Sequence, residues 1–269
     1  MRKTIIKNVL IQALKPNRFF VMLKKVRKRI MDKEGHHSKS DNLTWIESQC
    51  SDFKELANSL DAALWEEAEK VSKSLEIHAV KILENIEYNM GGGGGYPFLY
   101  FVTRYMEPDC IVETGVSAGF SSYAFLSAMK TNGRGGLYSS DFPLFRINNP
   151  ESYIGVLVEE SLKDNWILYV DGDEVSLPKI ARSLNKIDIF HYDSDKSYSG
   201  REFAVSVIDK LLSSNGVIVM DDIQDNCYFY DYIEQNNPNS WFVFKFQGKY
   251  IGMIGKLIGR CTSPSPLSH

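Results

Sequence analysis

The sequence contains few cysteines, and their arrangement excludes several kinds of site. Only four are present among 269 residues, Cys50, Cys110, Cys227 and Cys261, and none belongs to a CxxC pair. Widely separated thiols argue against a zinc site and are typical of proteins from a reducing compartment. We therefore expect a cytoplasmic protein without structural zinc.

Long uncharged stretches are also lacking. No window comes near the roughly 18 apolar residues that a transmembrane helix requires. Near the N-terminus, Lys15, Arg18 and the basic cluster from Lys24 to Arg29 interrupt each apolar run before it could form the core of a signal peptide. The sequence therefore predicts neither a membrane-spanning helix nor a cleaved leader.

Acidic residues are nearly absent from residues 1–33, which we call the N-terminal arm. The arm holds eleven Lys or Arg against one acid, Asp32, so its charge is +10 while the rest of the chain carries −13. Apolar residues such as Leu10 and Phe19 lie between the basic ones, which indicates amphipathic helices broken near Pro16. Two interpretations stay open: peripheral contact with the inner membrane surface or another acidic partner, and a solvated extension. We expect no nucleic-acid partner.

Composition and spacing divide the chain into one large domain with additions before it. Hydrophobic residues make up 43% of the sequence, which suits one large α/β domain rather than two. After the arm we predict a polar linker over 34–44, a helical cap over 45–90 on one side of the sheet, the main domain over 91–260, and a disordered tail over 261–269. Gly91 to Gly95 form a loop, either a flexible flap at a ligand entrance or an unconstrained connector.

Short apolar runs alternate with helical stretches through the main domain. This alternation predicts an α/β fold with a doubly wound, mostly parallel sheet and helices on both faces. The short connection Gln247-Gly248-Lys249 between the last two runs indicates an antiparallel hairpin at one edge. The expected strands are 110–112, 136–140, 166–170, 187–190, 216–220, 241–246 and 250–254, and the expected helices are 98–105, 121–129, 177–184 and 202–212.

Acidic side chains follow two of the apolar runs. Asp193 comes after one run, and Asp221 and Asp222 come after a later one. Carboxylates at the tips of parallel strands face one crevice and repel each other unless a hard cation or a cationic ligand joins them. Alternatively, these residues only cap the helices that follow. Lys196 would either neutralise the carboxylates or, with its pKa lowered by a cation and partial burial, act as a base.

A glycine-containing turn follows the first strand of the main domain. Gly115 and Gly119 allow close approach of a ligand, and free amides near Ser121 suit a carboxylate or phosphate. Asp141, at the end of the second strand, is placed to accept hydrogen bonds from ribose hydroxyls. These features also fit a nicotinamide cofactor, but Ser117 stands where that fingerprint has its second glycine.

Four segments in this order carry a resemblance to a known family: Glu113–Ser122, Leu137–Pro143, Asp188–Tyr198 and Asn215–Asp222. They resemble the motifs of class I S-adenosylmethionine-dependent methyltransferases, most closely the small-molecule O-methyltransferase-like branch that includes macrolide-sugar and catechol-type enzymes. The resemblance covers roughly residues 96–256. It implies a Rossmann-like methyltransferase fold and S-adenosyl-L-methionine as cofactor.

The resemblance also implies positions that bind the cofactor. The glycine turn would line its methionine part, with Ser121 at the carboxylate. Asp141 would hold the ribose, and Asp173 would lie beside the adenine. The implied cofactor-binding residues are Glu113, Gly115, Gly119, Ser121, Asp141, Asp173 and Asp193.

A metal site and a base complete the resemblance. Asp193, Asp221 and Asp222 match the ligands of Mg²⁺, or another hard divalent cation, in metal-dependent members, and Lys196 takes the place of the catalytic base. Two residues depart from the subgroups: Asp222 replaces an asparagine of the catechol branch, and Lys196 replaces a histidine common in the sugar branch. The implied reaction is cation-dependent O-methylation of a hydroxyl on a small molecule or sugar. A metal-independent methyltransferase and a nicotinamide-dependent oxidoreductase are the alternatives, and an oligomer stays open.

Overall fold

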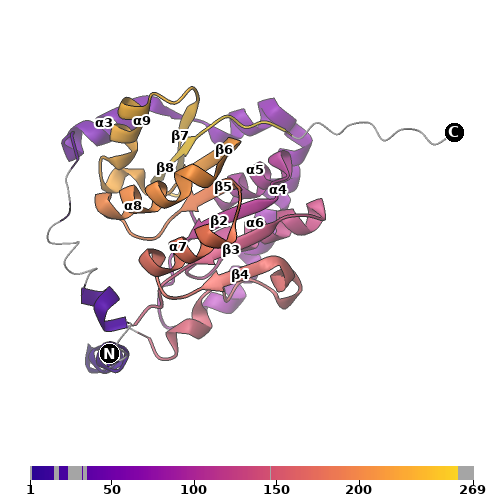
Figure 1. Ribbon diagram of the computed structural model, residues 1–269. Helices are drawn as coiled ribbons and strands as arrows, with labels where there is room; N and C mark the ends of the chain where they lie inside the picture. The colour runs from indigo at the N-terminus through magenta and orange to yellow at the C-terminus, as the bar shows by residue number, and fades with distance from the viewer. Residues whose placement is uncertain (1, 15–17, 24–31, 33–34, 146, 260–269) are drawn as a thin grey trace.

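The computed structural model describes residues 2–14, 18–23, 32, 35–145 and 147–259. Its strands are β1 (Cys50–Ser51), β2 (Cys110–Thr114), β3 (Gly136–Ser140), β4 (Trp166–Tyr169), β5 (Ile187–Tyr192), β6 (Leu212–Met220), β7 (Trp241–Phe246) and β8 (Lys249–Ile254). Among the described residues they form one eight-stranded sheet in the order β1-β7-β8-β6-β5-β2-β3-β4 (Figure 1). Within the described strands, β8 alone is antiparallel to its neighbours, β6 and β7. The predicted mostly parallel sheet with a C-terminal hairpin is confirmed, but the hairpin does not form the edge, because β1 pairs outside β7.

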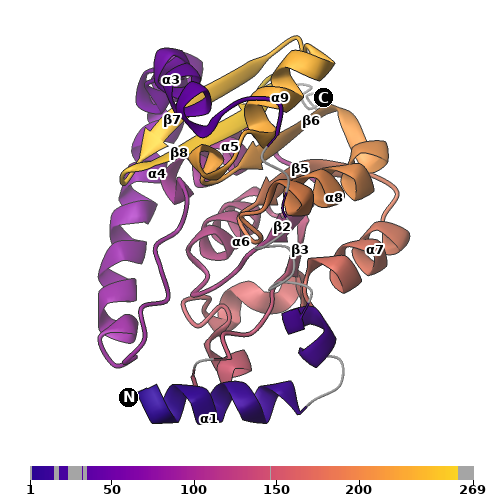
Figure 2. The same ribbon diagram turned by 90° about the vertical axis from the view of Figure 1, so that its left-hand side faces the viewer.

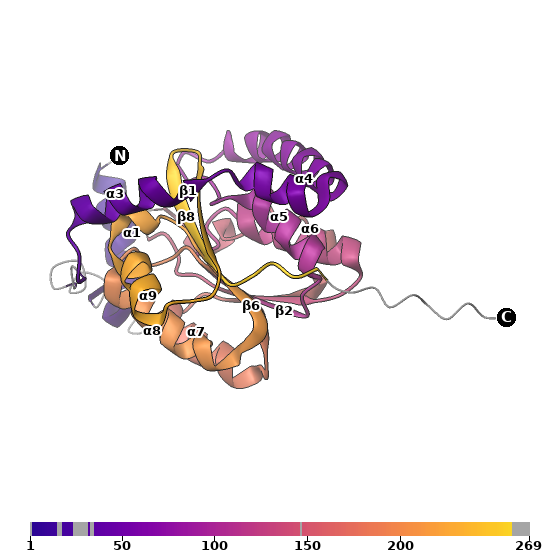
Figure 3. The ribbon, with the colours of Figure 1, turned by 90° about the horizontal axis from the view of Figure 1, so that it is seen from above.

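Helices cover both faces of the sheet. Figure 3 shows α5 and α6 on one side of β2 and β6, and α7 and α8 on the other. Alternate residues of each strand supply the two cores, so Ile111 and Ile189 pack toward α5 while Val112 and Phe190 pack toward α8. The α-helices of this part are α3 (Lys39–Gln49), α4 (Phe53–Leu83), α5 (Tyr96–Met106), α6 (Phe120–Asn132), α7 (Asp173–Ser183), α8 (Tyr198–Ile208) and α9 (Tyr228–Asn236). Short 3-10 helices lie at Pro150–Tyr153, Glu160–Asn165, Asp209–Leu211 and Ile223–Asp225.

The helices before the main domain lie on both sides of the sheet, which corrects the prediction that they cover one side. Ile46 of α3 belongs to the core beneath α8 and α9, whereas Phe53 and Trp65 of α4 belong to the core beneath α5. The change of side occurs at β1, which pairs in parallel with β7 at the edge of the sheet. α3 also begins at Lys39, inside the predicted linker, because the Ser38 hydroxyl caps it by accepting the Asp41 amide at 3.1 Å.

The N-terminal arm contributes helix α1 (Arg2–Ala13) and a helical segment over residues 18–23. Figure 2 places α1 at one end of the molecule. Further along, the carboxylate of Asp32 accepts the Tyr198 and Ser199 amides at 2.7 and 3.1 Å, which attaches the arm to the start of α8. No helix in the described residues has a stretch that is both long and apolar enough to span a bilayer. The predicted disordered tail, 261–269, lies outside the described residues.

Candidate active site

The glycine turn after β2 brings two strand ends together. Gly115 has a φ of +81°, and a Cβ added there would lie 2.1 Å from the carbonyl oxygen of Asp193. Only glycine therefore allows the backbone after β2 to pass so close to the backbone after β5. This approach places the turn beside the acidic end of β5.

A cavity opens at this edge of the sheet, above the ends of β2, β3 and β5. Four predicted cofactor residues line it: Gly115, Asp141, Asp173 and Asp193. Other parts of its wall come from the arm, from the residue directly before Gly91–Gly95, which we call the glycine loop, from the glycine turn and from the segment after β3. In that order, these residues are Val21, Met90, Ser117, and Phe142, Leu144, Pro150 and Ile154. The position agrees with the rule that ligands of doubly wound sheets bind outside the carboxyl ends of the strands.

Asp141 is held in place by the glycine turn. Its Oδ2 atom accepts a hydrogen bond from the Ser117 amide at 2.7 Å. Ser117 itself has a φ of +48°, and its hydroxyl donates to the Met90 carbonyl at 2.5 Å. Ser117, which stands where a dinucleotide fingerprint has its second glycine, thus connects the turn to Met90, directly before the glycine loop.

Asp173, the first residue of α7, joins two strand ends. Its carboxylate accepts the Ser140 hydroxyl at 2.7 Å and also the hydroxyl of Ser194. The residue therefore orders the wall of the cavity between β3 and β5. Its predicted place beside an adenine stays a prediction.

Glu113 and Ser121 lie behind the cavity, bonded to each other. The Glu113 carboxylate is fully buried and accepts the hydroxyls of Ser121, Ser122 and Ser139 at 2.5, 2.6 and 2.7 Å. Burial raises its pKa to about 7 despite these hydrogen bonds. Contact of either residue with the cofactor stays a prediction, while their observed contacts join β2, β3 and α6.

Gly119 directly precedes α6 and packs against a neighbouring loop. Its φ is +100°, and a Cβ there would lie 2.9 Å from the Cα of Gly155. The glycine thus lets the loop after β3 reach the start of α6. It is not among the residues that line the cavity.

Three carboxylates meet beside the cavity, as predicted from the sequence. Oxygen atoms of Asp193, Asp221 and Asp222 all lie within 4.8 Å of one another. Asp221 is almost fully buried, and its Oδ1 has no hydrogen-bond partner among the described residues. Burial and the charges of Asp193 and Asp222 raise the pKa of Asp221 to about 6. We call these three residues the aspartate cluster.

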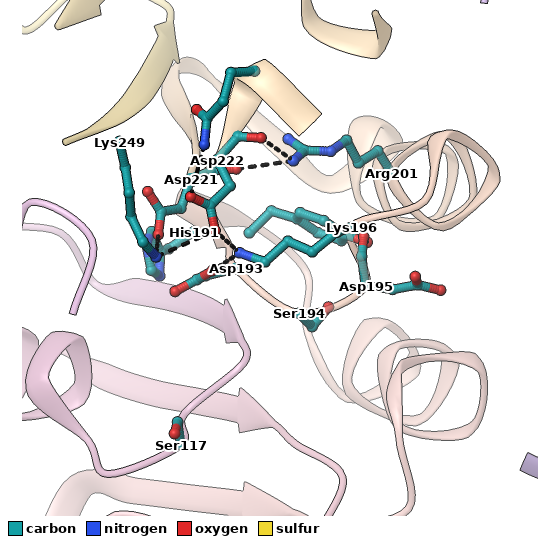
Figure 4. Close-up of polar contacts among 12 residues, drawn as sticks. Ser117, His191, Asp193, Ser194, Asp195, Lys196, Arg201, Asp221, Asp222 and Lys249 are labelled. Atoms are coloured by element: carbon teal, nitrogen blue, oxygen red, sulfur yellow. Dashed lines mark hydrogen bonds and ion pairs between the residues drawn. The ribbon is translucent and has the colours of Figure 1, made fainter. Parts of the chain in front are cut away.

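Two lysines reach the aspartate cluster (Figure 4). Lys196 Nζ lies 2.6 Å from Asp193 Oδ1 and also contacts Asp222, and Lys249 Nζ lies 3.3 Å from Asp221 and 3.2 Å from Asp222. Burial alone would lower the pKa of Lys196, but the charges of Asp193 and Asp222 outweigh it and raise that pKa. In this arrangement Lys196 is protonated and is a hydrogen-bond donor, not a base.

Arg201 holds the backbone of two residues of the aspartate cluster. Its side chain is almost fully buried, and Nη2 donates to the carbonyls of Asp221 and Asp222 at 3.0 and 2.8 Å. Asp222 has a φ of +51°, in the left-handed region, which aspartate adopts more readily than most other non-glycine residues do. The guanidinium group therefore holds the strand end that carries two of the three carboxylates.

The glycine loop passes directly over the aspartate cluster. A Cβ on the buried Gly94 would lie 2.4 Å from Asp221 Cγ, and one on Gly93 would lie 2.3 Å from Phe120 Cβ. The backbone at this point is therefore packed against a carboxylate and a helix start. This contact favours the functional interpretation of Gly91 to Gly95 over an unconstrained connector.

His191 fills the space behind the aspartate cluster. Its Nδ1 lies 3.9 Å from Glu113, and neither ring nitrogen has a hydrogen-bond partner among the described residues. Burial lowers its pKa to about 4, so the ring is neutral at pH 7.

The donor set fits a hard divalent cation. All three groups of the aspartate cluster offer carboxylate oxygens, which suit magnesium, calcium or manganese. The free Oδ1 of Asp221 is a buried acceptor without a proton donor, which a cation would satisfy. The two lysines neutralise part of the charge, but both are side chains on flexible stems that can move aside.

Several site residues have little or no signal in the sequence. Lys249, Arg201 and Gly94 come from three separate elements, and no local motif joins any of them to the carboxylates. Val21 lies in the arm, for which the sequence predicts a membrane contact or a solvated extension and not a place in the cavity wall. Only for Gly94 was there an indication, because five consecutive glycines already marked a loop of unusual freedom.

Comparisons with known proteins agree with this geometry. Residues 112–223 match a family described as a methyltransferase domain. The structure of the methyltransferase PaMTH1 from Podospora anserina, bound to SAH, has a TM-score of 0.52 and 15% identity, covering 71% of this chain and 96% of that one. The O-methyltransferase TomG from Streptomyces achromogenes, involved in tomaymycin synthesis and solved with SAM, has a TM-score of 0.51 and 14% identity, covering 68% and 89%. No curated protein matches the sequence.

Proposed function

We propose that this chain, whose residues 112–223 match a methyltransferase domain, is a class I S-adenosylmethionine-dependent methyltransferase that methylates a hydroxyl oxygen of a small molecule or sugar with the help of a hard divalent cation. The observation that carries the proposal is the aspartate cluster beside the cavity. Asp193 belongs to both, since it lines the cavity and supplies one of the three carboxylates. A cation held by the aspartate cluster would therefore adjoin the cavity.

The cavity offers groups that suit S-adenosylmethionine. Asp141 presents a carboxylate whose other contacts already orient it, and such a group forms strong hydrogen bonds with a ribose diol. Because Gly115 has no side chain, the backbone of the turn comes close to Asp193 at the cavity wall. When bound, the cofactor supplies a methyl group already activated by a sulfonium charge.

Lys196 is the proposed base, and its protonation depends on the aspartate cluster. Its amine is charged while Asp193 and Asp222 are its partners. A divalent cation in the cluster would take over both carboxylates and lower the pKa of a substrate hydroxyl and of the lysine. Lys196 would then be able to accept the hydroxyl proton, while Arg201 and the glycine loop hold the carboxylates in position.

The lysines also support a second candidate, a metal-independent methyltransferase of the same fold. Lys196 and Lys249 together bring two positive charges to three carboxylates. In that case they would replace the cation, and the cavity would only position the acceptor and the methyl group. The nicotinamide alternative is not favoured, because Ser117 occupies the position of the second glycine and contacts Met90.

Cation binding separates the two candidates without knowledge of the acceptor. Calorimetric titration of the full chain with Mg²⁺ or Mn²⁺ should show one site, weakened at least about tenfold in Asp221→Asn. Asp225→Asn is the matched control, since Asp225 is an exposed carboxylate close in sequence but outside the aspartate cluster. Absence of binding, or equal binding in Asp221→Asn, would leave the metal-independent enzyme as the better account.

A further inference from the structure

Near the end of helix α1 a polar side chain is buried while apolar side chains are exposed. Gln12 is only 8% exposed, whereas Leu14, directly after the helix, is 82% exposed. Leu10 and Ile11 are exposed as well. A helix that only packs on its own domain shows the opposite arrangement. The outer face of α1 therefore lacks an apolar partner among the described residues.

The next segment of the arm, residues 18–23, has two distinct faces. On the inner face, Arg18 pairs with Glu151 and lies over the ring of Phe145, 5.7 Å from its centroid, and Val21 lines the cavity. On the outer face Phe19, Phe20 and Leu23 are exposed. One side of this segment thus belongs to the active site, and the other side is free for a partner.

Charge indicates the chemistry of that partner. The exposed apolar side chains belong to the arm, whose charge is +10, while the rest of the chain carries −13. If a second copy of the chain were the partner, a symmetric pair would bring two positive arms together, and their repulsion would oppose the contact. An anionic lipid surface attracts the basic residues and accepts the apolar ones, and these two contributions together suffice for peripheral binding.

We propose that the exposed apolar side chains of the arm, Leu10, Ile11, Leu14, Phe19, Phe20 and Leu23, dock on an anionic phospholipid bilayer. The inner contacts of Arg18 and Val21 stay in place when they do, so the cavity lies close beneath the membrane surface. Asp32 attaches the end of the arm to Tyr198, the first residue of α8, which lies two positions after Lys196 in the sequence. Docking thus needs no rearrangement of the active site.

Vesicle sedimentation tests the proposal with the full chain. Vesicles containing about one third phosphatidylglycerol in phosphatidylcholine should bind the protein at least about tenfold better than vesicles of phosphatidylcholine alone, and salt should reduce the difference. The triple variant Phe19→Ser, Phe20→Ser and Leu23→Ser should lose about tenfold or more of that binding. Ile77→Ser with Val80→Ser is the matched control, because both residues are exposed apolar side chains of α4, and it should bind as the wild type does.

Three results would overturn the proposal. One is equal sedimentation of the triple variant and the control, and another is no preference for the anionic vesicles. The third is a dimer in light scattering that the triple variant abolishes, without vesicle binding, because a second copy would then be the occupant. Thermal unfolding of each variant verifies that it is folded. Sedimentation needs neither cofactor nor acceptor, so its result is independent of the proposed methyltransferase activity.

Discussion

Lys249, the first residue of β8, lies with its Nζ atom 3.3 Å from Oδ2 of Asp221 at the far end of β6. The lysine occupies space beside the aspartate cluster and repels any cation that enters it. Its own pKa is raised, because the charges of Asp221 and Asp222 outweigh the effect of burial. It is therefore positively charged throughout the physiological pH range.

Replacing this lysine should strengthen cation binding. Lys249→Met removes one positive charge from the site but keeps much of the side-chain volume, so the affinity for Mg²⁺ should rise about three- to tenfold. Lys245→Met is the control, since Lys245 lies over the ring of Tyr250 on the neighbouring strand. Weaker Mg²⁺ binding in Lys249→Met, measured by calorimetry, would contradict this role.

Gly94 should tolerate no side chain. An alanine methyl group would displace the Asp221 carboxylate or lift the loop, so Gly94→Ala should lower the free energy of unfolding by about 1–3 kcal/mol and weaken Mg²⁺ binding. Gly92→Ala is the control, because a Cβ there lies 3.3 Å from the mobile end of Gln247. Urea unfolding and calorimetry measure both effects, and similar behaviour of the two variants would remove the glycine loop from the site.

Arg201 should act on the aspartate cluster through the backbone. Arg201→Met leaves the Asp221 carbonyl without a donor, while the Asp222 carbonyl keeps the Asp225 amide at 3.0 Å, so the loss should cost about 1–3 kcal/mol in unfolding experiments. Arg201→Lys keeps a donor and a charge, so it should recover much of the Mg²⁺ affinity that the methionine variant loses. Equal Mg²⁺ affinity in wild type and Arg201→Met would show that the arginine only stabilises the fold.

Glu113 should make the stability fall as the pH rises. Burial raises its pKa in the folded state to about 7, above its ordinary value, so the folded protein binds the proton more tightly than the unfolded chain does. Between about pH 6.5 and 8 this should lower the free energy of unfolding by about 1 kcal/mol. Asp221, with a pKa of about 6, changes little in this range. His191 acts in the opposite direction, because its folded pKa of about 4 lies below its ordinary value of 6.5, so its loss of a proton in the unfolded chain stabilises the fold as the pH rises. The contribution of Glu113 is therefore the difference in slope between the wild type and Glu113→Gln, and equal slopes in urea unfolding would exclude Glu113 as a source.

The strands of the main domain could be predicted because their signals are local. β2 and β3 begin and end within two residues of the predictions, since each is an apolar run bounded by a turn and a polar residue. β1 has only two residues, and its position depends on pairing with β7, which no local pattern encodes. α9 is missing from the predictions although its buried side chains do lie on one helical face; with nine residues it is too short for the pattern to stand out in the sequence.

The candidate site also contains residues that local sequence signals predict and residues that they do not. Asp193 and Asp221 could be placed together because the ends of adjacent parallel strands share one edge of the sheet. Lys249 reaches them only through the antiparallel pairing of β8, and Val21 only through the packing of the arm on the domain. Both contacts are long-range, so they become visible only in the folded structure.

Calorimetric titration with S-adenosylmethionine tests the central claim most directly, because it needs neither the acceptor nor the metal. The wild-type chain should bind it at one site and should not bind NAD, and Asp141→Ala should weaken binding by about 1.5–3 kcal/mol, since it removes charged acceptors for the ribose. Removal of divalent cations with a chelator should leave the affinity largely unchanged. Absence of binding by the wild type, or equal affinity in Asp141→Ala, would contradict the account.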